Sequence, residues 1–491
     1  MAMALSFGSA ALLYLATEEV LVEAREIARP QARSRQTFSK LAMGRIRESF
    51  SNMSSKKKTS RNHTAKKRTS RSEPPPRKFL KTLGPGLITG ASDDDPSGIA
   101  TYSQAGAQFG YGMLWTMVLV YPLMAAIQEI SALVGRVTGS GIAGNMRRYY
   151  SGWLMYPVIT LLLIANTINL AADISAMGAA LKLLIGGPAL IYSASFAIVS
   201  VVLQILIPYN RYAGILKWLT LALFSYVATV FVVHVDWAQT LRGAFVPSLA
   251  FDARSATMLI AILGTTISPY LFFWQASAEV EEVEANDREK PLKEAPRQAP
   301  KQIQRIQIDT YLGMAFSNVV AFFIILTVAA TLHSQGKTEI QTAAQAAEAL
   351  RPVAGRFAFL LFSLGIIGTG MLALPVLAGS AAYAVGEALR WPVGLERKAR
   401  EAKGFYGVLA FATAIALGLD FTGIDPIKAL FWTAVINGII SCPIMAVMMH
   451  MTSNTKVMGK FVLSRRLQIT GWIATGVMVL GAVGLFATLG K

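Results

Sequence analysis

Three consecutive carboxylates, Asp93, Asp94 and Asp95, lie inside an apolar stretch and are followed at once by Pro96. Ionisable side chains are costly within a membrane, and they usually mark a site that binds or moves ions. Proline removes a backbone donor and disfavours helical geometry at the residue before it, and Gly98 weakens the helix further. We therefore expect a helix break in which free carbonyls lie beside carboxylates, a ligand set that suits a hard cation.

A second proline, Pro269, interrupts another apolar stretch and is flanked by hydroxyl residues that include Thr265 and Ser268. Pro96 and Pro269 each lie in the first apolar stretch of a block of five such stretches. Interrupted stretches at corresponding positions predict the binding site of a transporter. Two alternatives stay open: a simple kink at Pro269 and a purely structural polar network around the aspartates.

Other apolar stretches also contain polar side chains: Asn166, Asn169, Asp173, Asn318 and Asn437. The asparagines either line an aqueous path or form hydrogen bonds between helices. A lone buried carboxylate needs a functional reason, which favours a role for Asp173. Asp93 is an alternative path residue or a group that neutralises its neighbours, because three adjacent carboxylates do not all ionise cheaply. The candidates for a proton or ion path are Asp93, Asp173, Asn318 and Asn437.

Eleven apolar stretches carry these residues, and a membrane-spanning helix needs about 20 mostly apolar residues. They are about 83–105, 113–135, 153–182, 187–207, 214–236, 256–276, 309–332, 356–386, 404–420, 428–450 and 469–488. The 491 residues are 53% hydrophobic and only 15% charged, whereas soluble domains have about 25% charged residues. We therefore predict an all-α integral membrane protein and exclude a soluble one.

The Lys and Arg residues predict the orientation of these helices. Connections on the side of the N-terminus carry 20 Lys and Arg residues, and connections on the other side carry 7. Cytoplasmic loops are enriched in these residues. We expect a multi-pass protein of the bacterial inner membrane, with its N-terminus in the cytoplasm.

The N-terminal extension, residues 1–78, has a different composition from the rest of the chain. Of the net charge of +18, +15 lies between residues 25 and 81, in a region rich in Ser, Lys and Arg that ends in three prolines. It lacks the apolar content to fold alone, so we predict a largely disordered cytoplasmic segment near anionic lipids. The transmembrane domain, 79–491, is nearly neutral, so we expect no nucleic-acid partner.

Other chemistries lack support in the sequence. The single cysteine, Cys442, rules out an intramolecular disulfide, and the four histidines lie far apart, so no zinc cluster is visible. No nucleophile–base pair and no nucleotide-binding loop occurs. We therefore expect neither an enzyme nor a bound cofactor.

Several runs resemble motifs of the Nramp family of divalent-metal transporters. The runs similar to the first span and its loop are Gly84–Leu87, Asp95-Pro96, Ala100-Thr101 and Gln104–Tyr111. Those similar to the second and seventh spans are Gln128-Glu129, Gly135–Gly139, Arg305–Asp309 and Asn318. The resemblance covers about residues 83–490.

This resemblance implies a LeuT-like fold of about 11 transmembrane helices: two inverted five-helix repeats, about 83–236 and 256–450, and an extra helix at 469–488. It implies a metal held between the broken first and sixth spans. Asp95 matches the family's metal-binding aspartate, and Thr265 matches the position whose backbone carbonyl faces the ion. The resulting candidate metal ligands are Asp95, Asp94, Thr265 and Ser268, and the predicted helix breaks are Pro96, Gly98 and Pro269.

The chain also departs from the family pattern. Gly98 replaces an asparagine ligand, and Ser268 and Tyr270 replace a methionine ligand and a histidine linked to proton movement. Asp173 matches an aspartate of the proton route, but the nearby family glutamate falls at Ala176. Carboxylates and hydroxyls favour hard ions such as Mg²⁺ and Mn²⁺ over soft ones. The pattern also resembles the Nramp-related magnesium transporters, which depart from the family at the same ligand positions.

These observations together predict a secondary transporter that moves Mn²⁺ and/or Mg²⁺ by alternating access. A Na⁺-coupled carrier of amino acids or organic solutes on the same scaffold is the main alternative, although three aspartates would repel a substrate carboxylate. A membrane sensor without ion flux is a third hypothesis. The oligomeric state is not predicted.

Overall fold

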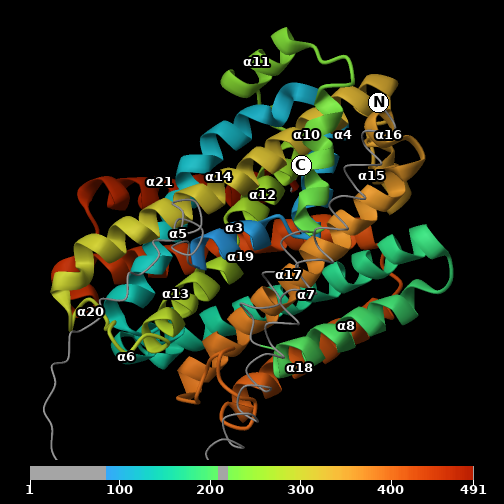
Figure 1. Ribbon diagram of the computed structural model, residues 1–491. Helices are drawn as coiled ribbons and strands as arrows, with labels where there is room; N and C mark the ends of the chain where they lie inside the picture. The colour runs from blue at the N-terminus through green and yellow to red at the C-terminus, as the bar shows by residue number, and fades with distance from the viewer. Residues whose placement is uncertain (1–84, 208–218, 490–491) are drawn as a thin grey trace, which may run out of the picture. The chain divides into compact units, whose positions relative to one another are not determined.

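The computed structural model describes residues 85–207 and 219–489 (Figure 1). The predictions made for residues 1–78, including their contact with anionic lipids, lie outside the described residues. Within the described ranges the secondary structure is entirely helical.

The first half of the described chain contains ten helical elements. They are α3 (Pro85–Asp93), α4 (Pro96–Phe109), η1 (Gly110–Met113), α5 (Leu114–Thr138), α6 (Ile142–Tyr149), α7 (Gly152–Ile185), α8 (Ala189–Leu206), η2 (Leu219–Leu223), α10 (Phe224–Val230) and α11 (Trp237–Phe245).

The second half follows a similar order of long helices. It contains α12 (Ala253–Thr266), α13 (Pro269–Glu284), η3 (Pro296–Gln298), α14 (Ala299–Thr331), η4 (His333–Gln335), α15 (Ala343–Glu348), α16 (Arg351–Ala354), η5 (Gly355–Phe357), α17 (Ala358–Leu389), α18 (Lys403–Asp420), α19 (Pro426–Ser453), α20 (Thr455–Met458), η6 (Gly459–Phe461) and α21 (Arg465–Leu489).

Nine helical runs in the described residues are long and apolar enough to cross a membrane, whereas the sequence predicts eleven spans. Two differences explain the count. The part of the first predicted span from Pro96 onward and all of the second form one continuous run, Pro96–Thr138. The fifth predicted span, 214–236, is described only from residue 219, and its helix ends already at Val230.

The two prolines begin new helices. Pro96 is the first residue of α4, and the preceding Asp95 is extended, with φ −66° and ψ 170°. Pro269 likewise begins α13 after the extended Ser268, with φ −81° and ψ 135°. Proline is well suited to the first helical position, where its missing N–H costs no hydrogen bond. Gly98, in contrast, lies inside the first turn of α4 and not at the break.

Close helix contacts hold both broken spans in the interior. A Cβ added to Gly90 of α3 would lie 2.3 Å from the Gly313 backbone of α14, and one added to Gly264 of α12 would lie 2.0 Å from Ala434 O of α19. Glycine is therefore required at both crossings. Of the most apolar window in α12–α13, 83% is buried, against 22% in α8. The broken helices thus form the centre, and α8 leaves most of its apolar residues exposed.

Candidate functional site

The carboxylate of Asp95 is buried at the break of the first span and accepts hydrogen bonds from three elements. Its Oδ1 accepts from Ser97 Oγ at 2.6 Å and from the Gly98 backbone N–H at 2.8 Å, both in α4. Its Oδ2 accepts from Asn169 Nδ2 of α7 at 3.0 Å and from Tyr270 Oη of α13 at 3.3 Å. Asp95 therefore joins the first broken span to the second and to α7.

Asp93 and Asp94 have a different partner, Ser317 of α14. The Ser317 hydroxyl lies 2.6 Å from Asp93 Oδ2 and 3.0 Å from Asp94 Oδ1. Because a hydroxyl carries one proton, it donates to one of these oxygens at a time. The other two oxygens, Asp93 Oδ1 and Asp94 Oδ2, are buried without a hydrogen-bond partner among the described residues.

Asp94 and Asp95 therefore have different hydrogen-bond partners, and their place in one ligand set stays a prediction. Asp94 is directed with Asp93 toward α14, and Asp95 is directed toward α7 and α13. The helix ends at Asp93, and successive side chains beyond a helix end point to different sides. The three adjacent aspartates thus divide between two polar clusters.

Ser268 and Thr265 contact each other at the second break. The Ser268 hydroxyl donates to Gly264 O at 2.7 Å and to Thr265 O at 3.0 Å. These carbonyls lie in the last turn of α12, where helix termini leave acceptors unsatisfied. The hydroxyl and the Thr265 carbonyl are thus engaged with each other, and Tyr270, two residues after Ser268, supplies the contact to Asp95.

The predicted path residues occupy different environments. Asp173 of α7 is buried, neither carboxylate oxygen has a hydrogen-bond partner in the described part of the chain, and it lies within electrostatic range of Asp95. Asn437 of α19 is also buried, with both amide atoms unpartnered within the same ranges, whereas Asn318 of α14 is partly exposed. Unsatisfied buried polar groups are rare and call for a functional explanation.

The structure separates the two asparagines of α7 that the sequence left ambiguous. Asn166 Nδ2 donates to Leu377 O at 2.9 Å and to Ser380 Oγ at 2.7 Å, both in α17, and therefore links two helices. Asn169, three residues later, contacts Asp95, and its Oδ1 is buried and unpartnered among the described residues. An amide that contacts a carboxylate and keeps a free oxygen has the chemistry of a cation ligand.

Sequence reasoning missed three of the side chains around the aspartates as site residues, Ser97, Tyr270 and Ser317, and left the role of Asn169 open. Tyr270 had a usable signal, because it stands directly after the helix-breaking Pro269 and at the position of the family histidine. Ser317 had none, since the rotation of α14 about its axis decides which of its residues face α3.

The described residues contain no metal site built from charged side chains and histidines alone. Within residues 85–207 and 219–489, no group of three or more His, Cys, Asp and Glu side chains is arranged to hold a metal. A divalent ion at Asp95 would therefore use one carboxylate together with neutral oxygens and water, as Mg²⁺ sites commonly do.

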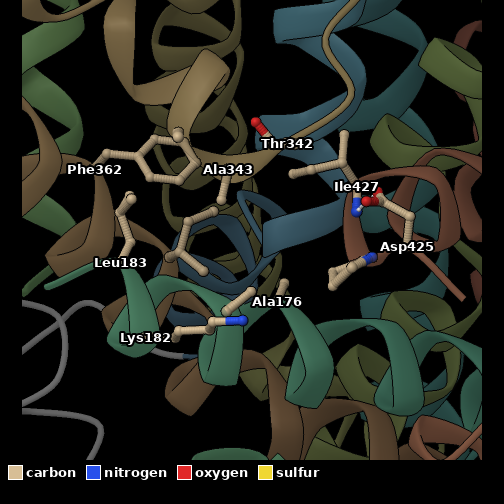
Figure 2. A pocket seen from close by; sticks show the side chains of 12 residues that line it. Ala176, Lys182, Leu183, Thr342, Ala343, Phe362, Asp425 and Ile427 are labelled. Carbon is tan, nitrogen blue, oxygen red and sulfur yellow. Dashed lines mark hydrogen bonds between the residues drawn. The ribbon is translucent and has the colours of Figure 1, made fainter. Parts of the chain in front are cut away.

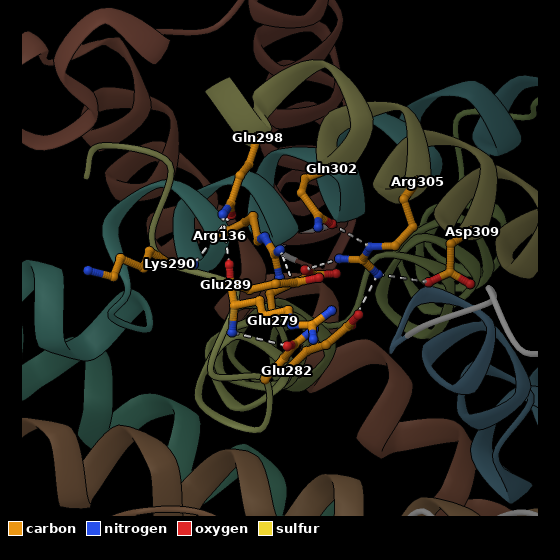
Figure 3. A network of polar contacts seen from close by, with 11 residues as sticks. Arg136, Glu279, Glu282, Glu289, Lys290, Gln298, Gln302, Arg305 and Asp309 are labelled. Atoms are coloured by element: carbon orange, nitrogen blue, oxygen red, sulfur yellow. Dashed lines mark hydrogen bonds and ion pairs between the residues drawn. The ribbon is translucent and has the colours of Figure 1, made fainter. Parts of the chain in front are cut away.

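A network of charged side chains holds the N-terminal end of α3, the end remote from Asp95 (Figure 3). Arg305 of α14 is paired with the buried Glu279 of α13, and it lies 3.1 Å from Glu282 and 3.9 Å from Asp309. Asp309 Oδ2 in turn accepts a hydrogen bond from the Gly86 N–H at 2.7 Å. The network therefore ties the start of α3 to α14 and, through Arg305, to α13.

Two further contacts strengthen this end of the molecule. Thr89 of α3 donates to Gln275 of α13, and the fully buried Arg136 of α5 pairs with Glu289. Burial alone would raise the pKa of Glu289, but the hydrogen bond and charge of Arg136 outweigh it and hold that pKa below the ordinary value. The half-helices α3 and α13 are thus fastened to each other and to their neighbours.

Two cavities lie away from Asp95. The larger, about 320 Å³, is lined by residues of α7, α17, α19 and the connection after α14, including Ala176, Lys182, Thr342 and Asp425 (Figure 2). The smaller, about 200 Å³, is lined by Gln104 and its neighbours, and both touch Ile427. Ala176 follows Asp173 by three residues on the same helix, so the larger cavity opens about one turn from that buried carboxylate.

Residues 86–488 match the family model described as natural resistance-associated macrophage protein-like. The chain belongs to the Nramp family. This match contains both broken spans and the whole Asp95 cluster, by which we mean Asp95 and its hydrogen-bond partners Ser97, Gly98, Asn169 and Tyr270. The protein is therefore a membrane transporter of a divalent-metal transport family and not an enzyme.

Individual Nramp proteins and a more distant transporter resemble the chain. The divalent metal cation transporter MntH of Klebsiella pneumoniae (strain 342) is 25% identical over 416 residues, which cover 82% of this chain and 92% of that protein. The Eremococcus coleocola manganese transporter, in complex with an aromatic bis-isothiourea substituted compound, has a TM-score of 0.65 and 16% identity, and the match covers 84% of this chain and 87% of that one.

The structure of MhsT in complex with L-phenylalanine also matches, with a TM-score of 0.57 and 13% identity over 82% of this chain and 98% of that one. At these identities the structural matches establish the fold, which is the LeuT-like fold that the resemblance implied. The boundaries of the two inverted repeats stay a prediction.

Proposed function

We propose that this Nramp protein moves a divalent cation across the membrane by alternating access and binds it at Asp95, between the two broken helices. The observation that carries this proposal is the buried Asp95 carboxylate, which contacts α4, α7 and α13 at once. A site that joins these helices is coupled to their relative motion. The names of the MntH and manganese-transporter relatives support a divalent metal as the substrate.

The chemistry of the site favours a hard ion, Mn²⁺ or Mg²⁺. Asp95, Asn169 and Tyr270 offer oxygen atoms, and the position of the family methionine is Ser268. A carboxylate has about four lone-pair sites, and four donors already occupy those of Asp95. An ion must displace a donor or bind through water. Mg²⁺ dehydrates reluctantly and keeps several waters, so this arrangement suits a largely hydrated ion.

Asp173 is the residue we propose for a proton or second-ion route. It lies within electrostatic range of Asp95, and the larger cavity begins near Ala176 on the same helix. With the N-terminus in the cytoplasm, as the Lys and Arg distribution predicts, that cavity opens toward the outside. The charged network around Arg305 then lies on the cytoplasmic side.

A Na⁺-coupled amino-acid carrier is the second candidate, since the fold is shared with MhsT, whose structure contains L-phenylalanine. The three buried aspartates oppose it, because they would repel a substrate carboxylate.

The deciding experiment is uptake into proteoliposomes of Mn²⁺, Mg²⁺, Ca²⁺ and Cd²⁺, with and without a pH gradient, and of L-phenylalanine with a Na⁺ gradient. We expect Mn²⁺ and Mg²⁺ uptake, and its loss in Asp95→Ala. Asp420→Ala, at the end of α18, serves as the matched control and should retain uptake. Na⁺-driven phenylalanine uptake without metal flux would favour the carrier, and metal binding without any flux would favour a sensor.

A further inference from the structure

The short helix α11 exposes a regular apolar stripe. Trp237, Leu241 and Phe245 are 55%, 58% and 69% exposed. They are spaced four residues apart, so they lie along one side of the helix. No described part of the chain covers this side of α11, although it carries three large apolar side chains.

The rest of α11 divides into a packed face and a polar face. Thr240, Gly243 and Ala244 are buried against α5 and η1, and a Cβ on Gly243 would lie 2.2 Å from Tyr111 O. Gln239 and Arg242 are exposed. At about 100° per residue, the apolar stripe lies between the packed face and the polar face. A helix lying flat on a membrane beside a protein body has this order of faces.

Exposed apolar residues continue from α11 to the adjoining spans. Phe231, just after α10, is 79% exposed, and Phe251, just before α12, is 98% exposed. In Figure 1 α11 lies at the top of the view, beyond the labels of α10 and α12. Tryptophan at the end of a span is typical of the membrane interface. Exposed apolar side chains therefore flank the stripe in both connections, the one from α10 and the one to α12.

We propose that α11 lies in the membrane interface with Trp237, Leu241 and Phe245 in lipid and with Gln239 and Arg242 in water. The occupant of the stripe is lipid, and not a second copy of the chain, because exposed apolar residues flank α11 in the connections to both neighbouring helices of the transmembrane domain. Under the proposed orientation this is the outer leaflet.

This placement connects the lipid surface to the substrate helix. The connection after α11 contacts η1 through Ser248 Oγ, which donates to Gly112 O at 3.2 Å. The turn η1 directly follows the C-terminal end of α4, and α4 begins directly after Asp95. A lipid-anchored α11 therefore braces the end of the half-helix that carries Ser97 and Gly98, and lipid composition becomes a factor in transport.

The test uses the single cysteine of the chain. In a Cys442→Ser background, Leu241→Cys places a nitroxide label on the stripe, and Arg242→Cys is the matched control on the polar face. The full-length labelled proteins are reconstituted in liposomes, and collisions of the label with O₂ and with a water-soluble nickel chelate are measured. We expect the ratio of O₂ to nickel collisions to be higher for Leu241→Cys than for Arg242→Cys.

Equal nickel access at the two positions would overturn the proposal, since both labels would then be in water. Spin–spin broadening at Leu241→Cys would overturn it in another way, by showing that a second copy covers the stripe. Because the readout is label accessibility, it does not depend on which ion is transported. A second variant, Leu241→Glu, should lower metal uptake more than Arg242→Glu, and equal uptake would contradict the bracing role of α11.

Discussion

At Asp95 four hydrogen-bond donors compete with any cation for one carboxylate. Ser97 and the Gly98 N–H belong to the same half-helix and move with Asp95, whereas Asn169 and Tyr270 belong to other helices. The two remote donors are therefore the ones that a conformational change removes. Tyr270 forms the longer contact, so it is the donor that we expect an ion to displace first.

Tyr270→Phe should increase the preference for Mn²⁺ over Mg²⁺. The change deletes the 3.3 Å contact to Asp95 and a 3.4 Å contact to Ser92 O, and it keeps the buried ring. Hydrogen bonds to charged groups contribute about 1.5–3 kcal/mol, so one carboxylate oxygen becomes available for direct coordination. Mg²⁺ gains less from it because it keeps its waters. A shift of about tenfold, about 1.4 kcal/mol, is expected in competition of Mg²⁺ against Mn²⁺ uptake.

Tyr383→Phe is the control for this change. Tyr383 is equally buried, but it donates to Glu281 and not to Asp95. It should leave the competition unaltered. The same competition curve for Tyr270→Phe and the unsubstituted protein would exclude Tyr270 from the site.

At the scale of helices, the half-helix α3 is held by backbone contact on one side and by charged groups at its start. Gly86 and Gly90 lie against the α14 backbone, and Asp309 accepts a hydrogen bond from the Gly86 N–H. In alternating access one half of a broken helix must move relative to its neighbours. These contacts hold the start of α3 against α14, so such a movement would have to break them.

Gly90→Ala should destabilise the protein although alanine favours helices. The new Cβ would lie 2.3 Å from the Gly313 backbone, and such overpacking costs about 1–3 kcal/mol. Gly407→Ala in α18 is the control, because its Cβ meets nothing within 4 Å. It should be neutral or stabilising by up to about 1 kcal/mol. Thermal unfolding in detergent measures both, and equal melting temperatures would contradict the close contact of α3 with α14.

Arg305→Met should be strongly destabilising, because it leaves the buried Glu279 without its paired charge. Removing one partner of a buried ion pair costs about 3–5 kcal/mol. The double variant Arg305→Met with Glu279→Gln removes the unpaired charge as well and should recover much of the loss. The single variant Glu279→Gln is measured beside them. If the stability loss of the double variant equals the sum of the losses of Arg305→Met and Glu279→Gln, the two residues are not coupled. The measurement is again unfolding of the purified protein.

For the whole molecule, charge and hydrophobicity are segregated along the chain. Of the net charge of +18, +15 lies between residues 25 and 81, while the transmembrane part is nearly neutral. The Asp95 cluster and both broken spans lie outside this basic region. We therefore expect the site to form its ligand set without the tail.

Deletion of residues 1–75 should leave metal uptake largely unchanged and should reduce binding to anionic lipids. Each Lys or Arg near an anionic membrane contributes about 1 kcal/mol of attraction, which the truncated protein loses. The measurements are uptake into proteoliposomes and co-sedimentation with vesicles of anionic and of neutral lipid. A truncated protein that inserts into the membrane but has no flux would assign a gating role to the tail.

The sequence by itself determined the helices and where they break. Helical hydrogen bonds are local, so long apolar runs predict the spans, and Pro96 and Pro269 start new helices because proline lacks an N–H. The motifs around Asp95 were also sufficient to indicate the family. The end of the fifth span was placed too late, at residue 236 and not at Val230, because apolar composition alone does not show where a helix ends.

Only the tertiary structure decided which polar groups meet. Asn169 and Tyr270 are remote from Asp95 in sequence, and Ser317 is remote from Asp93 and Asp94. Spans such as α7 contact protein on one side and lipid on the other, so they are apolar all round, and their pattern does not reveal which side faces inward. Close packing at residues such as Gly90 and Gly264 sets which side of each helix faces its neighbours, and this decides which side chains reach the aspartates.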